Sequence, residues 1–504
     1  MLRSLRSVRS ISNMTRSPPQ SPLIAIIGAT GTGKSQVSTQ LSHIGTLSAD
    51  HNSQLAVSLA QHFNGEIING DALQLYAGLP IITNKISAEE AHGIPHHLLG
   101  CVGLKEQTWV VGTFVRRALK VIEEFRSRGK LPILVGGTHY YTQSLLFHDR
   151  LAEREDGLEQ PDEVSDDEER QNFPLLQQPT EVLLKELKKV DPVMADRWHP
   201  KDRRKIQRSL EIYLKTGKRA SEVYAEQRLR KTGNATNGRA DEEGMMLDEP
   251  AMRFPTLLFW VHAEVDALRN RLDKRVDKML EAGLLQEVRT LNAHAEEEAM
   301  AGRPVDETRG IWVSIGYKEY KDYVHALEAG DTDEKDLEKL KADALERTKI
   351  ATRQYAKRQV RWIRIKLVNA LSEANCSNNF YLLDGSDVSK FAATVEDPAA
   401  ELTQTFLHGS PMPRPEDTST MAAELLKPKR EYDLSAKPET WTKQHCEVCD
   451  VTCVIQEQWK QHVGSKTHKK LVSKRKKQTM LNDHGSEAGN TGTEASSEAH
   501  QQPP

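Results

Sequence analysis

The stretch LIAIIGATGTGKS, residues 23–35, decides the fold of this chain. Its first five residues are apolar and mostly β-branched, which is typical of a short buried strand. The rest matches the spacing G-x-x-x-x-G-K-[ST], in which backbone N–H groups and a lysine surround a phosphate and a hydroxyl is available to Mg²⁺. A helix that begins near Gly33 would direct the positive N-terminal end of its dipole at the same phosphate. We therefore predict a P-loop that binds phosphate through Gly28, Ala29, Thr30, Gly31, Thr32, Gly33, Lys34 and Ser35, with Ser35 as the Mg²⁺ ligand.

The overall composition indicates a large soluble protein with unevenly distributed charge. The chain has 504 residues and a formal net charge of −3, so it can hold two or more domains. Residues 149–170 are strongly acidic, whereas residues 466–477 are basic. Three of the five cysteines cluster near the C-terminus, which favours a metal site in a reducing compartment over a disulfide framework. No stretch approaches the ~20 apolar residues of a membrane span.

Residues 1–22 form a basic, serine-rich tail without acidic residues. This composition is typical of a mitochondrial transit peptide, and a basic tail without that function is the alternative. Met14 offers a second start that would remove most of the tail. We therefore expect a mitochondrial and a cytoplasmic location, and the basic stretch near the C-terminus also allows a nuclear one.

The first part of the predicted catalytic core spans residues 23–150. Strands at residues 65–70 and 131–135, with a helix at 113–128 between them, predict a parallel, doubly wound α/β sheet. Asp71 follows the second strand and would face the ligand crevice, and its alternative role is to cap the next turn.

The helix expected after the P-loop occurs twice, at 36–44 and 54–63, with a loop-like stretch at 45–53 between the copies. Removing residues 37–54 leaves a single amphipathic helix, so these residues interrupt it. They are either a true surface insertion or a translated retained intron, and the sequence of the transcript distinguishes the two.

Residues 151–255 are predicted to form a helical insertion with flexible acidic and polar loops. Between Arg203 and Arg219 this region has seven cations and one acid, which favours contact with a phosphate backbone over a merely solvated surface. The second part of the core, residues 256–395, begins with a strand at 256–261. A helical region at 265–291 follows, in which Arg271 and Arg275 share a face and could clamp a diphosphate, or could be surface ions.

The C-terminal region combines a predicted linker, residues 396–440, with a zinc finger at residues 441–477. The spacing C-x2-C-x12-H-x5-H predicts a tetrahedral Zn²⁺ site on a ββα unit whose helix begins near Glu457. Its ligands would be Cys446, Cys449, His462 and His468, with Cys453 in the small core. The basic exit of the finger favours nucleic acid or nuclear import, and residues 478–504 are predicted to be disordered.

Eight ordered sequence blocks resemble the tRNA dimethylallyltransferases, in the eukaryotic form with a C-terminal C2H2 zinc finger. The blocks are GATGTGKS, GEIINGDALQLYAGLPIITNK, IPHHLLG, GGTHYYTQSLL, HPKDRRKIQRSLEIYLKTGKRASE, MLEAGLLQEV, IGYKEY and TRQYAKRQ. They cover most of residues 23–365. The resemblance implies a P-loop NTPase-like parallel sheet flanked by helices, a helical insertion domain and a finger similar to those that bind double-stranded RNA.

The resemblance also implies a reaction, in which dimethylallyl diphosphate lies on the P-loop and prenylates N6 of adenosine 37 in the anticodon loop of tRNA. Asp71 would orient and deprotonate the amine of the flipped-out base. Lys34, Thr30, Mg²⁺ and one or both of Arg271 and Arg275 would stabilise the leaving diphosphate. The residues implied to contact tRNA are Asp71, Ala72, Leu73, Gln74, Thr138, Arg204, Lys205, Ile206, Gln207 and Arg208.

This chain departs from the family pattern at Ala72 and Leu73, where relatives usually have Ser and then Met or Val. Two other functions compete with the transferase. A P-loop small-molecule kinase would use the P-loop for ATP but leaves the basic helices and the finger unexplained, and a non-catalytic RNA-binding protein would keep the fold without the reaction. We expect the chain to act as a monomer on the anticodon stem-loop.

Overall fold

The computed structural model describes residues 17–32, 51–148, 173–226, 252–429 and 441–487. Residues 1–16 of the transit-like tail, most of the interruption after the P-loop, and Gly33, Lys34 and Ser35 lie outside these ranges, as do most of the acidic and polar loops of the insertion. The chain divides into two compact units. The core unit comprises Met1–Pro161 and Gly238–Tyr432, and the second unit comprises Asp162–Asn237 and Asp433–Pro504.

A parallel sheet of six strands forms the centre of the core unit, in the order β3-β2-β4-β1-β5-β6. The strand β1 pairs with β4 on one side and with β5 on the other, so segments from before and after the insertion close one sheet. This confirms the predicted parallel α/β fold, and it adds β3 and β6, which the sequence pattern did not predict. The strands are β1 (Leu23–Gly28), β2 (Gly65–Asn69), β3 (His96–His97), β4 (Leu131–Gly136), β5 (Thr256–His262) and β6 (Phe380–Asp384).

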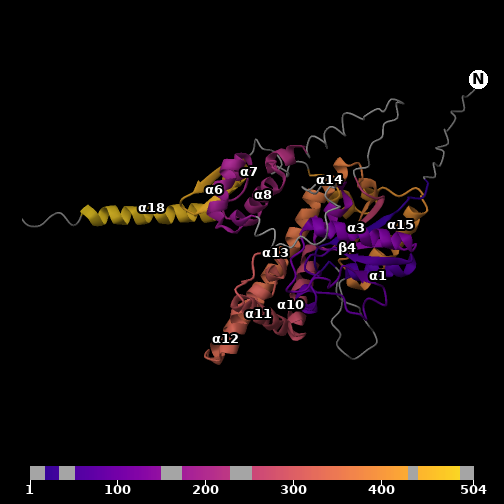
Figure 1. Cartoon of the computed structure of the whole chain (residues 1–504), viewed down its shortest axis with the longest axis horizontal. Coiled ribbons are helices and arrows are strands. Elements are labelled where there is room, and N and C mark those ends of the chain that lie inside the picture. Colours follow the sequence, from indigo (N-terminus) through magenta and orange to yellow (C-terminus); the bar gives the residue numbers. More distant parts are fainter. Residues whose placement is uncertain (1–16, 33–50, 149–172, 227–251, 430–440, 488–504) are drawn as a thin grey trace, which may run out of the picture. The chain divides into compact units, whose positions relative to one another are not determined.

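Helices cover both faces of the sheet because alternate strand residues point to opposite sides. In β1, Ile24 and Ile26 pack with α1 (His51–His62) and α15 (Asp397–Leu407). Leu23, Ala25 and Ile27 contribute to the other core, which contains α3 (Val111–Ser127) and α4 (His139–Leu146). Helices α1, α3 and α15 are labelled in Figure 1. Both cores are largely apolar, although polar strand residues such as Glu66 and Thr256 are also buried.

The helices that follow β5 lie next to the P-loop and differ in part from the prediction. The predicted helix at 265–291 is two helices, because Gly283 adopts φ 109° and ends the regular hydrogen bonding. Remaining helices of this unit are α2 (Pro80–Thr83), α10 (Val265–Glu281), α11 (Leu284–Met300), α12 (Tyr317–Ala329), α13 (Glu334–Trp362), α14 (Val368–Glu373) and α16 (Thr420–Leu425). Short 3₁₀ turns cover Gly310–Val313, Ser377–Asn379, Val388–Lys390 and Pro415–Asp417, and π turns cover Ile363–Leu367 and Ala392–Glu396.

The prediction that residues 396–440 form a linker is wrong for about the first thirty of these residues. Helix α15 begins there with Pro398 in its first turn, a position that suits proline. Leu402 and Phe406, four residues apart, are buried against the sheet core, and Ala422 of α16 is fully buried. The proline, serine and threonine content of this region concealed an amphipathic helix that completes one face of the sheet.

The second unit combines the helical insertion with the zinc finger. The insertion supplies α6 (Thr180–Val190), α7 (Pro192–Arg197), α8 (Arg203–Thr216) and a 3₁₀ turn at Pro174–Gln177. The finger has the predicted ββα order, with β7 (Trp441–Cys446), β8 (Val451–Ile455) and α17 (Gln456–Gly464). A further helix, α18 (Lys466–Glu487), shows that the predicted disorder from residue 478 is wrong up to residue 487.

Candidate active site and metal centre

The described part of the P-loop, residues 28–32, is buried and is held in part by side chains from distant parts of the core unit. The N–H of Thr30 donates to Oε1 of Gln359 at 2.8 Å, and Oγ1 of Thr32 donates to the carbonyl of Ala29 at 2.9 Å. Gly31 has φ 79°, and a Cβ there would lie 2.6 Å from Cδ2 of Leu272. A glycine is therefore required at this position for both conformation and space.

The two arginines of α10 have different partners. Nη1 of Arg275 donates to Oγ1 of Thr30 at 2.5 Å, so Arg275 contacts the P-loop directly. Arg271 donates to the carbonyls of Gly385, at 2.7 Å, and Ser386, in the turn after β6. That turn abuts the P-loop, since a Cβ on Gly385 would lie 2.5 Å from the carbonyl oxygen of Thr32. Arg271 thus supports the P-loop indirectly, through the backbone of the turn after β6.

Asp71 lies immediately after β2 in a turn whose conformation is fixed by hydrogen bonds. Its N–H donates to Oδ1 of Asn69 at 3.0 Å, and its own Oδ1 accepts from the N–H of Leu73 at 3.0 Å. The N–H of Ala72 donates to Oγ1 of Thr138 at 3.0 Å, which joins this turn to the end of β4. Asp71 does cap the turn, as its alternative role predicted, but a carboxylate has acceptor capacity beyond one such bond.

Gln74 lies a turn further on than Asp71 and takes part in a separate contact. Its Nε2 donates to the carbonyl of Asn84 at 2.9 Å. The residues predicted around Asp71 therefore split into two groups. Asp71, Ala72 and Thr138 come together, and Gln74 ties the segment after β2 to the end of α2.

Helix α13 contributes two residues that the sequence reasoning did not single out. Burial, and then the neighbouring Asp71 carboxylate, raise the pKa of Tyr355 well above its usual value. Gln359, one turn later on the same face, is 5% exposed and holds the P-loop. Both residues lie in the block TRQYAKRQ, but a tyrosine and a glutamine in a charged helix carry no local sequence signal of contact with Asp71 or with the P-loop.

A cavity of about 330 Å³ lies beside the P-loop in the core unit. Gly31 contributes to its wall, and Ile81 and Met279 give it apolar surface. Its cations come from α10 and from the segment after α2, and they are Lys85, Arg271, Lys274, Arg275 and Lys278. A polar anion with a short apolar tail fits this combination of charge and surface.

The wall that carries Lys85 is anchored by a buried carboxylate. Glu287 of α11 accepts from the N–H groups of Ile81, at 2.9 Å, and Ile82, at 2.7 Å, at the start of α2. Burial raises the pKa of Glu287. Burial lowers the pKa of Lys85 to about 8, and the nearby Glu287 offsets part of this shift. The charge of Lys85 therefore depends on pH around this value.

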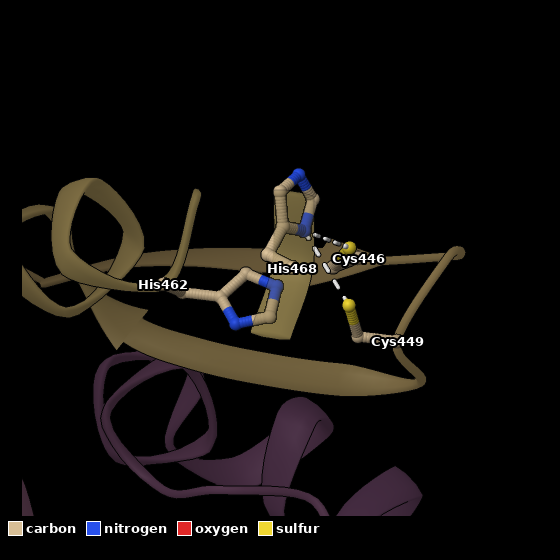
Figure 2. A group of neighbouring side chains, drawn as sticks. All are labelled: Cys446, Cys449, His462 and His468. Atoms are coloured by element: carbon tan, nitrogen blue, oxygen red, sulfur yellow. Dashed lines mark hydrogen bonds between the residues drawn. The ribbon is translucent and has the colours of Figure 1, made fainter. Parts of the chain in front are cut away.

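The four predicted zinc ligands come together in the finger, as Figure 2 shows. Their ligand atoms lie within 4.8 Å of one another, and Nδ1 of His468 is 3.6 Å from Sγ of Cys446 and 3.4 Å from Sγ of Cys449. Tetrahedral Zn²⁺ places sulfur and nitrogen ligands roughly 3.6 Å apart, given Zn–S and Zn–N distances near 2.2 Å. The donor set and its spacing therefore suit zinc. Cys453 is buried in the finger core, as predicted.

The basic segment of α8 is only partly available to a partner. Ile206 is fully buried, so the prediction that its side chain contacts tRNA is wrong, because it belongs to the core of the second unit. Arg204 and Lys205 are exposed, and Lys205 pairs with Asp202 at 2.7 Å. Arg208 pairs with Glu211 at 2.9 Å, and Gln207 is half-buried. Much of this positive charge is thus balanced locally.

The finger packs against the insertion through β7 and α7. The guanidinium of Arg197 lies 4.8 Å from the ring centroid of Trp441 and 4.5 Å from that of Trp198. Nζ of Lys443 donates to the carbonyl of Ala195 at 2.7 Å. These contacts join segments about 240 residues apart in the chain, so the insertion and the finger form one structural module.

The fold and the site together define an α/β protein with a P-loop, an acidic residue at the adjacent sheet edge and a C-terminal Cys2His2 finger. The sequence matches the IPP transferase family over residues 74–366, and the chain belongs to this family. It is 35% identical to the tRNA dimethylallyltransferase of Schizosaccharomyces pombe, covering 90% of this chain and 96% of that protein. The human tRNA dimethylallyltransferase is 33% identical, with coverage of 90% and 87%.

A solved structure gives the same result at the level of the fold. A crystal structure of a eukaryotic dimethylallyltransferase acting on tRNA matches with a TM-score of 0.65 and 32% sequence identity. The match covers 92% of this chain and 99% of the other. Within the described ranges, no helix combines the length and apolar character needed to cross a membrane.

Proposed function

We propose that this protein transfers the dimethylallyl group of dimethylallyl diphosphate to N6 of adenosine 37 in tRNA and forms N6-isopentenyladenosine. The observation that carries the proposal is that Arg275 donates to Thr30 of the P-loop, while Asp71 and Arg275 both lie close enough to Tyr355 to influence its phenol. Membership of the IPP transferase family, and the names of its relatives, support the same activity.

The donor side of the site is cationic around the P-loop. We assign the diphosphate to the loop from Gly28 to Ser35 and to the adjoining cavity, whose apolar wall suits the five-carbon tail. As the allylic carbon–oxygen bond breaks, charge develops on the diphosphate, and Arg275 beside Thr30 is placed to stabilise it. Ser35 is the residue we assign to Mg²⁺, which would neutralise further charge on the leaving group.

The acceptor side of the site centres on Asp71. The adenine must leave its stack to present N6, and a carboxylate must orient that weakly nucleophilic amine. The N6–carbon bond forms as the carbon–oxygen bond breaks, the amine proton passes to Asp71, and diphosphate leaves. Tyr355 remains a neutral phenol next to Asp71, because its pKa is raised.

The second unit is the part that we assign to the RNA stem. Arg204 and Lys205 of α8 are exposed, and α18 begins with the basic run from Lys466. Cations on this module would contact phosphates and position the anticodon stem-loop without reading its sequence. We further propose that the chain acts as a monomer. A mitochondrial and cytoplasmic location remains a proposal that rests on residues 1–22 and Met14.

Substitution of Asp71 by Asn tests the proposed base. Asp71→Asn keeps the shape of the side chain and removes the proton acceptor, so we expect transfer to fall by roughly 10²- to 10⁴-fold while binding of anticodon stem-loop RNA is kept. The assay is incorporation of label from dimethylallyl diphosphate. Asp322→Asn, at an exposed aspartate of α12, is the matched control and should leave transfer unchanged. Unchanged turnover in Asp71→Asn would refute the assignment, and phosphoryl transfer from ATP would favour a kinase.

A further inference from the structure

Gln359 is a buried amide that joins two backbone segments of the site. Its Oε1 accepts from the N–H of Thr30 at 2.8 Å, and its Nε2 donates to the carbonyl of Gly137 at 2.9 Å. The two partners are 107 residues apart in the chain, in the P-loop and in the turn after β4. Because one partner is a donor and the other an acceptor, the amide can take only one orientation.

The turn at Gly137 is itself part of the acceptor side. Thr138 follows it directly and accepts from the N–H of Ala72, next to Asp71. A continuous path of hydrogen bonds therefore runs from the P-loop through Gln359 to the turn that carries Asp71. Close packing supports this path, since a Cβ on Gly136 would lie 2.4 Å from the carbonyl oxygen of Gly70.

Helix α13 packs against both segments, and this packing fixes the position of the Gln359 amide. Ala356 is packed with Ala29 of the P-loop and with Leu268 and Leu272 of α10. The ring of Trp362 lies 5.6 Å from that of His139, in the helix that begins at the turn after β4. Gln359 lies between these two contacts along α13.

We propose that Gln359 is a positioning residue that sets the distance between the diphosphate cradle and the catalytic carboxylate. This inference rests on the proposed function. The N–H of Thr30 already donates its hydrogen bond to Gln359. The peptide between Ala29 and Thr30 is therefore oriented by α13 and not by the phosphate. Loss of either hydrogen bond would let the P-loop and the Asp71 turn move independently, and small misplacements of reacting groups reduce rates strongly.

Gln359→Glu tests this proposal, because lowering the pH should restore the function of the variant. An ionised carboxylate can still accept from Thr30, but it faces the carbonyl of Gly137 without a donor. Burial raises the pKa of such a carboxyl, and once protonated it has the shape and both hydrogen-bonding functions of the original amide. We expect kcat for prenyl transfer to fall roughly 10- to 100-fold relative to wild type at pH 8, and the ratio to wild type to recover as the pH is lowered to 6.

The matched control is Gln354→Glu, an exposed glutamine on the same helix, whose activity should follow wild type at every pH. Gln359→Met removes both hydrogen bonds at similar volume, so its kcat should be low without recovery at pH 6. In both Gln359 variants the affinity for stem-loop RNA should stay within about twofold of wild type. If Gln359→Glu does not fold, Gln359→Asn, which is too short to make both bonds, should show the same fall in kcat at constant RNA affinity.

Two results would overturn the inference while leaving the proposed function intact. One is wild-type kcat in Gln359→Glu at pH 8. The other is a pH-independent loss in which kcat and RNA affinity fall together, as expected of a merely structural residue. Absence of transfer in the wild-type protein itself would instead overturn the proposed function.

Discussion

Arg271 and Arg275, between which the sequence left the choice of diphosphate ligand open, differ in their hydrogen-bond partners. Arg275 contacts Thr30 of the P-loop, whereas Arg271 donates to two carbonyls of the turn after β6. We expect Arg275→Lys to raise KM for dimethylallyl diphosphate by roughly tenfold and to lower kcat, because a single ammonium cannot reproduce the planar guanidinium. Steady-state kinetics at saturating RNA measure both constants.

Arg271→Lys is the comparison for this prediction, since it lies on the same face of the same helix. Its first effect should be on the stability of the turn at Gly385 and Ser386, seen as a lower melting temperature with a smaller change in KM. Equal kinetic defects in the two variants, with equal melting temperatures, would contradict the division of roles.

Lys85 gives the site a dependence on pH. In the folded protein its pKa is lowered to about 8, so the cavity loses one positive charge as the pH rises through 8. We expect kcat/KM for the diphosphate donor, which reports the free enzyme, to fall over this range. Lys85→Arg, whose guanidinium stays charged, should remove the fall. A fall that persists unchanged in Lys85→Arg would assign the titration to another group.

The same shift has a definite sign for stability. Below pH 8 Lys85 is charged in both the folded and the unfolded chain, and burial penalises the folded state. Between about pH 8 and the usual lysine pKa the unfolded chain binds more protons, so the contribution of Lys85 to the free energy of unfolding rises with pH. In Lys85→Met this contribution should be absent, which denaturant titrations at pH 7.5 and 9.5 would measure.

At the scale of elements, α2 has only four residues and depends on Glu287 for its position. The carboxylate satisfies the N–H groups of Ile81 and Ile82, which a helix this short cannot satisfy internally. Glu287→Ala should lower the free energy of unfolding by about 2 kcal/mol, because two buried donors lose their partner. Chemical denaturation measures this, and Glu297→Ala, more than half exposed on the same helix, is the control.

Local sequence patterns predicted those elements whose residues interact mainly with their own neighbours. The strand Leu23–Gly28, the P-loop glycines and the ββα finger follow from apolar runs and fixed spacings. The strand Phe380–Asp384 and the helix Asp397–Leu407 were missed, because their apolar residues become visible only against β5 and α1. Tertiary packing stabilises this helix in a segment whose composition predicted a linker.

The candidate site likewise contains some residues that the sequence could predict and others that it could not. Asp71 could be predicted because it ends a strand beside a P-loop. Gln359 could not, because a glutamine in a charged helix has no local signal of burial, and its partners Thr30 and Gly137 lie 329 and 222 residues away. Ile206 was assigned to RNA from its neighbours in sequence, whereas its side chain faces the core.

At the scale of the whole molecule, the finger is an internal part of the insertion module. Its strand β7 begins at Trp441, which packs on Arg197, and ends at the metal ligand Cys446. Metal binding therefore fixes one end of the strand whose other end holds α7. Because structural zinc contributes directly to folding, the stability of this interface should depend on the metal.

Removal of the metal is the last prediction. Chelation, or Cys446→Ser, should release β7 from α7, because the Cys446 end of the strand is no longer held and the Arg197–Trp441 contact contributes only about 1 kcal/mol. Hydrogen exchange should speed up at residues 192–197 as well as in the finger, and the Kd for stem-loop RNA should rise roughly tenfold. Single-turnover transfer at saturating RNA should change little, since the core unit is intact. Cys101→Ser, an exposed cysteine of the core unit, is the control. Unchanged exchange at residues 192–197 after complete loss of zinc would show that the finger and the insertion are energetically independent.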